Sequence, residues 1–240
     1  MKHKILWIYM ILSFIGLSLF YYYIHIQELD KTFLTISTFV FSIFMGFFIS
    51  RQDGRYDKIR QNLSQFDGDM SSIYRALCHL GPDVQDRAGE IIKRHYDNVI
   101  GNDSWDCHII RESTTVTDLH ELVEDVASDK KLSNLQNTTV MRVLLALHDL
   151  QITRKGFIAS YQERLPKVQW LLVDVLALIV LINISAIFSQ YLVFTSLLKA
   201  TFGTAIVLTL LLLQQLDNLA LFEGAVGEDS AKDVVNIIRE

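Results

Sequence analysis

The sequence predicts an all-α, polytopic membrane protein, and its apolar stretches carry that prediction through their length, number and composition. Four such stretches form two hairpins, and a long polar segment separates the first hairpin from the second. They run over Ile5–Ile26, Phe33–Ile49, Val168–Phe188 and Tyr191–Leu216. Because about 20 helical residues cross a bilayer, each stretch has the length of a membrane helix. Lipid admits only helices and closed barrels, and the presence of only 2 prolines in 240 residues favours helices.

Composition sets the expected domain organisation. The chain is 50% hydrophobic and 20% charged, and its net charge of −5 gives no case for nucleic-acid binding. A chain of this length accommodates one membrane bundle with a soluble elaboration. We therefore expect a first transmembrane hairpin (1–50), a cytoplasmic helical segment (51–167), a second transmembrane hairpin (168–216) and a C-terminal cytoplasmic tail (217–240).

Basic residues predict the orientation of the membrane helices. They precede the first stretch, follow the second and precede the third: Lys2, Lys4, Arg51, Arg55, Lys58, Arg60, Arg164 and Lys167. Since Lys and Arg gather on the cytoplasmic side, both termini and the polar segment are expected in the cytoplasm. The first stretch imitates a signal peptide, but it ends in the bulky Phe20–Tyr23 and no small-residue cleavage site follows. An uncleaved membrane helix is therefore favoured.

The polar segment has apolar residues at helical spacing. The helix of the second stretch is expected to continue from Gln52 to about Leu80 and to end at Gly81-Pro82. Further helices are expected at Pro82–Val99, Leu119–Ala127 and Asn137–Arg164, with a loop at Ser128–Leu135. The predicted inward residues of the Gln52–Leu80 continuation are Leu63, Phe66, Met70, Ile73, Tyr74 and Leu77. Those of the last are Leu144, Leu147, His148, Ile152 and Phe157.

Motifs for metal binding and catalysis are weak or missing. Cys78-His79 and Cys107-His108 lack the tight pairing of structural zinc ligands, so neither a metal nor a cofactor is predicted. The sequence has no zinc-protease, nucleophile-elbow or phosphate-loop motif. The scattered residues His95, Asp97, His108 and His120 are interpreted as buried or solvated side chains. We therefore do not expect an enzyme.

Residues 39–60 resemble the second helix of the bestrophin family, particularly of its bacterial members. In that family an apolar helix containing Gly-Phe runs on into Arg-Tyr and a further Arg. Gly46, Phe47, Arg55, Tyr56 and Arg60 match this pattern without a gap. Weaker resemblances extend to the bestrophin-like bacterial membrane proteins at Tyr74-Arg75, Pro82–Tyr96, Arg154–Trp170 and Leu216–Gly224. No acidic run follows the last stretch, so the resemblance does not include a calcium clasp.

The resemblance implies a homopentameric ion channel of the bacterial inner membrane, with lipid, permeant ions and other copies of the chain as partners. The second helix would line the pore, and Phe39, Ile43 and Phe47 would form its neck. Their i, i+4, i+8 spacing places them on one helix face, flanked by the small residues Ser42 and Gly46. Narrow apolar rings gate by dewetting. Because nearly all residues of a membrane helix are apolar, a lipid-facing triple remains the alternative.

Several polar residues keep two interpretations open. Gly46, Arg51, Arg55, Tyr56 and Arg60 would line a cytoplasmic vestibule or pack between helices. Glu28 and Asp30 would form an acidic ring at the outer mouth or belong to a solvated linker. Asp174 and Asn183 lie within the third stretch. Asp174 would pair with Lys167 or Arg164 or act in permeation, and Lys199 is expected to snorkel to the interface.

A second class of function fits the same layout. The chain would then be a non-conducting membrane scaffold or sensor whose cytoplasmic helices bind a partner. The number of subunits discriminates the two hypotheses, since a monomer or dimer has no axial pore.

Overall fold

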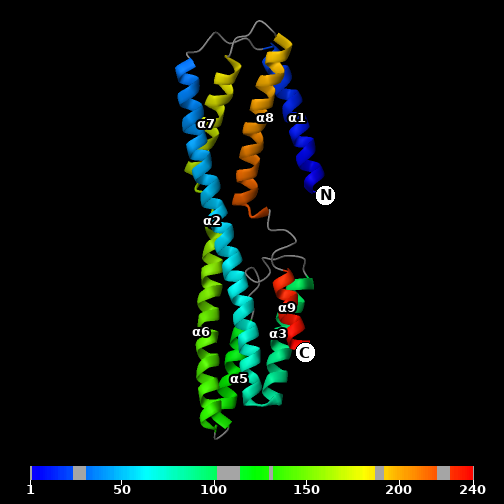
Figure 1. Cartoon of the computed structure of the whole chain (residues 1–240), viewed down its shortest axis with the longest axis vertical. Coiled ribbons are helices and arrows are strands. Elements are labelled where there is room, and N and C mark those ends of the chain that lie inside the picture. The colour runs from blue at the N-terminus through cyan, green and yellow to red at the C-terminus, as the bar shows by residue number, and fades with distance from the viewer. Residues whose placement is uncertain are drawn as a thin grey trace. The chain divides into compact units, whose positions relative to one another are not determined.

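The computed structural model describes residues 2–23, 31–101, 114–129, 132–186, 192–220 and 228–239; most of these are helical, and no strand occurs among them. The predicted all-α fold is therefore confirmed (Figure 1). The helices are α1 (Lys2–Tyr23), α2 (Lys31–Leu77), η1 (Cys78–Leu80), α3 (Pro82–Gly101), α5 (Thr115–Asp129), α6 (Asn134–Gln162), α7 (Lys167–Ser185), α8 (Leu192–Asp217) and α9 (Glu228–Arg239).

Length and composition identify the helices that can cross a membrane. Among the described residues three qualify: Thr32–Leu80, Lys167–Ser185 and Val193–Asp217. Phe14–Tyr23, at the end of α1, is a shorter apolar helix. The chain is thus an all-α, multi-pass membrane protein that contacts lipid, and α1 as a fourth span stays a prediction.

The chain divides into two compact units. The membrane unit comprises Met1–Gly54 and Arg164–Ala220, and the helical unit comprises Arg55–Glu163 and Leu221–Glu240. The α2 helix contributes its apolar beginning to the first unit and its polar remainder to the second.

In the membrane unit, α1 and α7 both pack against α8. Gly203 of α8 permits the approach of α1, because a Cβ atom there would lie 2.9 Å from Leu17 Cδ1. The hydroxyl of Tyr21 donates a hydrogen bond to the carbonyl of Leu181, at 3.3 Å. A small residue such as Gly203 lets helix backbones approach closely in lipid, where packing replaces the hydrophobic effect.

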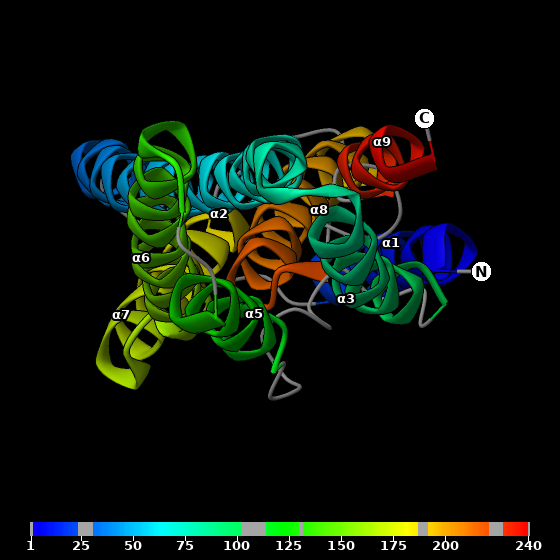
Figure 2. The same ribbon diagram turned by 90° about the horizontal axis from the view of Figure 1, so that it is seen from below.

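In the helical unit, α3 packs against α5 and α9, and α5 packs against α6 (Figure 1). Figure 2 shows the last turns of α2 between α6 and α9. The predicted inward residues of α2 are confirmed: Leu63, Phe66, Met70, Ile73 and Leu77 are buried, and Tyr74 packs against the core. The predicted break is also confirmed, since Gly81 has a φ of +124° and α3 begins at Pro82.

The predicted inward face of α6 is partly wrong. Leu147 and Phe157 are buried, but His148 and Ile152 are exposed, because the buried face follows Val140, Val143, Leu147 and Leu150. The preceding loop is shorter than predicted, since α5 extends to Asp129 and α6 begins at Asn134. Ser133 and Gln136 form a capping box that fixes this start.

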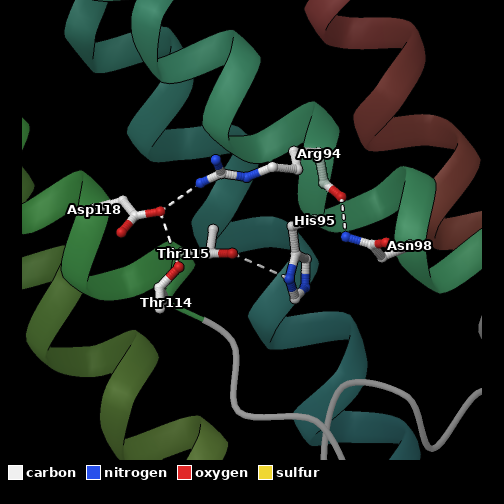
Figure 3. A network of polar contacts seen from close by, with 6 residues as sticks. All are labelled: Arg94, His95, Asn98, Thr114, Thr115 and Asp118. Carbon is white, nitrogen blue, oxygen red and sulfur yellow. Dashed lines mark hydrogen bonds and ion pairs between the residues drawn. The ribbon is translucent and has the colours of Figure 1, made fainter.

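Polar contacts join α3 to α5 (Figure 3). The guanidinium of Arg94 binds the carboxylate of Asp118, which also accepts a hydrogen bond from the hydroxyl of Thr114 at 3.0 Å. His95 is buried, lies 3.3 Å from Thr115 Oγ1 through its Nδ1, and packs edge-on against Tyr96. His95 is therefore buried, which is one of the two interpretations that the sequence analysis gave for it.

Candidate functional site

The apolar part of α2 is the least buried of the candidate membrane spans. Within its most apolar window 17% of the residues are buried inside the chain, against 33% for α7 and for α8. Its buried edge is narrow and consists of Ser37, Phe41, Met45 and Phe48, spaced by three or four residues. Most of the circumference of this helix is therefore available to lipid or to another chain.

The predicted neck residues lie on the exposed part of α2. Phe39, Ile43 and Phe47 have exposed fractions of 66%, 53% and 60%. Gly46 is also exposed, and a Cβ atom there would meet no described atom within 4 Å. Packing among the described residues thus requires neither the three apolar side chains nor the glycine.

A buried hydrogen bond holds α2 to α7. The side-chain amide of Asn183 donates to Ser37 Oγ at 2.7 Å, and both residues are buried. In a membrane bundle such a bond replaces hydrogen bonds to water that lipid cannot provide. Asn183 therefore has a packing role, and Ser37, which the sequence analysis did not identify, is its partner.

Lys199, for which snorkelling stays a prediction, contacts the end of a neighbouring helix. Its ammonium group donates a 2.8 Å hydrogen bond to the carbonyl of Ser185, at the end of α7. The last four carbonyls of a helix lack partners within the helix, and a cation binds them favourably. Lys199 thus caps the neighbouring helix.

Asp217 is the main polar residue at the end of α8, and the sequence analysis missed it. Its carboxylate is buried and accepts hydrogen bonds from Gln52 Nε2 at 3.2 Å, from the backbone N–H of Leu165 at 2.8 Å and from Trp170 Nε1 at 3.2 Å. It therefore joins α2, the segment before α7, and α7 itself. A single acid directly after a long apolar stretch is the signal that could have identified it.

The arginines after the apolar part of α2 differ in environment. Arg51 is half-buried and donates to Gln169 Oε1 at 3.4 Å. Arg55 is buried, and its guanidinium donates to the carbonyls of Ser160 at 2.7 Å and Tyr161 at 2.5 Å. These carbonyls belong to the last turn of α6, so Arg55 caps that helix. This arrangement fits the packing alternative rather than the vestibule.

The remaining predicted residues are placed as follows. Tyr56 is buried and Arg60 is exposed.

Asp174 is exposed and forms no ion pair with Lys167 or Arg164 in the described part of the chain, which corrects the predicted pairing. The physical reason is distance, since the seven residues from Lys167 to Asp174 span about 10 Å of helix. The predicted acidic mouth, Glu28 and Asp30, lies outside the described residues.

The described residues contain no group of three or more His, Cys, Asp or Glu side chains that could hold a metal ion. Cys78 is exposed. Cys107 and His108, the second Cys-His pair of the sequence, lie outside the described residues.

Comparisons with known proteins agree with the resemblance at residues 39–60. The family model named bestrophin-like domain matches residues 22–226. No curated protein and no solved structure matches the chain. The matched range contains the apolar part of α2, α7, α8 and the carboxylate of Asp217. The chain therefore belongs to the bestrophin-like family.

Proposed function

We propose that the chain is a homopentameric ion channel of the bacterial inner membrane, with α2 lining the pore. The main support is the exposed apolar face of α2. This helix has the least intrachain burial of the candidate spans, and Phe39, Ile43 and Phe47 occupy its free side. Five copies around an axis would form three stacked apolar rings, which would gate ion flow because ions lose their hydration there.

A second apolar stripe supports assembly. Met141, Leu145 and Ile152 on α6 are more than half exposed, with fractions of 61%, 62% and 56%. Their spacing of four and seven residues places them on one side of the helix. In a segment outside the membrane, such a stripe is typical of a surface that contacts another chain. The proposed occupant is a second copy of the same chain.

The proposed orientation follows the basic residues. Both termini and the polar segment 51–167 lie in the cytoplasm, and Glu28 and Asp30 form an acidic ring at the outer mouth. Arg51 and Arg60 are the remaining candidates for a vestibule, since Arg55 is engaged with α6. Asp174, an exposed acid in a membrane helix, is assigned to the interface between copies or to the permeation path.

The test measures conductance of purified protein in planar bilayers. The variant Phe39→Ala, Ile43→Ala, Phe47→Ala widens the proposed neck and is expected to raise the open probability. The matched control truncates three exposed apolar residues of α7: Leu171→Ala, Leu178→Ala and Ile182→Ala. It is expected to conduct as the wild type does.

Two results contradict the channel. One is silence of both the wild type and the neck variant in bilayers. The other is a monomer or dimer in native mass spectrometry, which leaves no axial pore. Either result favours the scaffold or sensor whose cytoplasmic helices bind a partner.

A further inference from the structure

The helical unit contains a polar groove that the proposed pore does not use. It encloses a volume of about 580 Å³, within the range of small-molecule sites. Three helices with the short η1 form its walls, and the last turns of α2 lie between α6 and α9 (Figure 2). The lining residues that carry polar side chains are Ser71, Ser72, Arg75, His79, Thr139, Arg142 and Asp233.

The spacing of these residues explains why they converge. Ser72, Arg75 and His79 follow one another by three and four residues, so they share one face of α2 and η1. Thr139 and Arg142 are three residues apart on α6, and this pair faces the same groove. Each guanidinium therefore comes from a different helix, which places positive charge on two walls.

The polar side chains of the groove differ in whether other described residues engage them. In the described residues, neither Arg75 nor Arg142 forms a hydrogen bond or ion pair, and the same holds for Ser72 and His79. In contrast, two hydroxyls of the groove donate to backbone carbonyls of their own helices. Ser71 donates to the carbonyl of Asp67 at 3.0 Å, and Thr139 donates to the carbonyl of Leu135 at 3.0 Å. The groove thus offers two guanidiniums, a hydroxyl and an imidazole to a ligand.

This donor set matches the chemistry of a phosphate group. Guanidinium groups bind phosphate oxygens through paired, charge-assisted hydrogen bonds, and hydroxyl and imidazole groups supply further donors. Asp233 opposes the two arginines, and these three side chains together carry one net positive charge. We propose that this groove binds a phosphate-bearing anion between Arg75 and Arg142, with Asp233 weakening its binding.

The test titrates the full chain in detergent micelles with pyrophosphate and follows binding by calorimetry. We expect saturable binding to the wild type. Arg75→Gln and Arg142→Gln are each expected to weaken it about tenfold, the cost of one charge-assisted contact. The matched control is Arg87→Gln on α3, whose side chain is exposed and lies outside the groove; it should bind as the wild type does.

Asp233→Asn makes the test independent of folding. Removing the opposing carboxylate is expected to tighten pyrophosphate binding, a change that a damaged fold cannot produce. Repeating the experiment in nanodiscs distinguishes the two sources of the phosphate group. If phosphatidic acid in the nanodisc, but not phosphatidylcholine alone, competes with pyrophosphate, a lipid headgroup reaches the groove; if it does not compete, the ligand is soluble.

Three outcomes overturn the proposal. The first is the absence of saturable binding by both pyrophosphate and phosphatidic acid. The second is an equal effect of Arg87→Gln and Arg75→Gln. The third is an Asp233→Asn variant that binds no tighter than the wild type. Since none of these measurements depends on conductance, they leave the proposed channel untouched.

Discussion

The two units of the chain distribute apolar and polar residues in opposite ways. In the helical unit the core consists of apolar side chains such as Met70, Ile92 and Leu147, all fully or almost fully buried. In the membrane unit, large apolar residues such as Phe39 and Phe194 are exposed, while Asn183 and Asp217 are buried and hydrogen-bonded. Water drives apolar groups inward, whereas lipid leaves them outside and requires polar groups to find partners inside.

Exposed apolar residues in the helical unit are an exception to this contrast. Substituting them is expected to have the largest effect, which is on assembly. Leu145 and Ile152 of α6 are exposed although the unit lies outside the proposed membrane segment. If they contact another copy, Leu145→Glu with Ile152→Glu places charges in that interface and should abolish assembly. Native mass spectrometry of the purified protein measures the subunit count.

The control for this variant changes exposed polar residues of the same helix to Glu. Gln151→Glu with Gln162→Glu adds the same charge outside the stripe and should leave the subunit count unchanged. An unaltered oligomer in the Leu145, Ile152 variant would show that the stripe is not an interface between copies.

Arg55 tests whether a buried cation in the helical unit stabilises it. Arg55→Met removes the donors to the carbonyls of Ser160 and Tyr161 and leaves both without this partner. We expect a loss of about 4 kcal/mol in unfolding free energy, because hydrogen bonds from charged groups are the stronger ones. Denaturant unfolding in detergent measures it. Lys58→Met, an exposed site on the same helix, is the control and should change little.

Substituting Asp217 tests whether a buried anion stabilises the membrane unit. Asp217→Ala removes the acceptor for Gln52, Leu165 and Trp170. The expected loss is about 3 kcal/mol, since buried donors without partners pay their desolvation cost. Asp217→Asn keeps one acceptor oxygen and should lose less. The exposed Asp174→Ala serves as control, and an equal loss there would contradict the role of Asp217.

The sequence predicts the buried residues of the two units unequally, because apolar side chains behave differently in water and in lipid. In the helical unit the spacing of Leu63, Phe66, Met70 and Ile73 identified the buried face of α2 correctly, because only one face of that segment is apolar. For α6 the same reasoning mixed two apolar stripes. It combined Leu147, which is buried, with Ile152, which belongs to the exposed stripe.

In the membrane unit, periodicity carries little information because nearly every position is apolar. The polar residues are the better guide there. Asn183 attracted attention in the sequence, but its partner Ser37 did not, since a serine in an apolar helix often bonds only to its own backbone. Asp217 was missed because its three donors lie far away in the sequence, at Gln52, Leu165 and Trp170. The neck residues stay a prediction, because a single chain does not contain the axis.

The smallest expected effect concerns an acid in the apolar core of the helical unit. Asp67 lies well beyond the apolar stretch of α2 and is buried, and Tyr96 donates a 2.6 Å hydrogen bond to its Oδ1. Burial raises the pKa of Asp67 above its ordinary value of 3.8, while hydrogen bonds from Ser230 and Tyr96 oppose that shift. Burial, with the nearby Asp67 charge, raises the pKa of Tyr96 well above 10.0, so this hydroxyl stays a donor.

A raised pKa in the folded state means that the folded chain binds a proton more readily than the unfolded chain does. Asp67 therefore adds stability as the pH falls through its folded pKa, and this gain is complete below the unfolded pKa of about 4. Asp67→Asn mimics the protonated acid and should remove this rise, which thermal unfolding at several pH values would measure. The exposed Asp57→Asn should retain it. If both variants kept the wild-type dependence of stability on pH, Asp67 would not be the cause of that dependence. Burial in this core would then not disfavour the ionised form of Asp67.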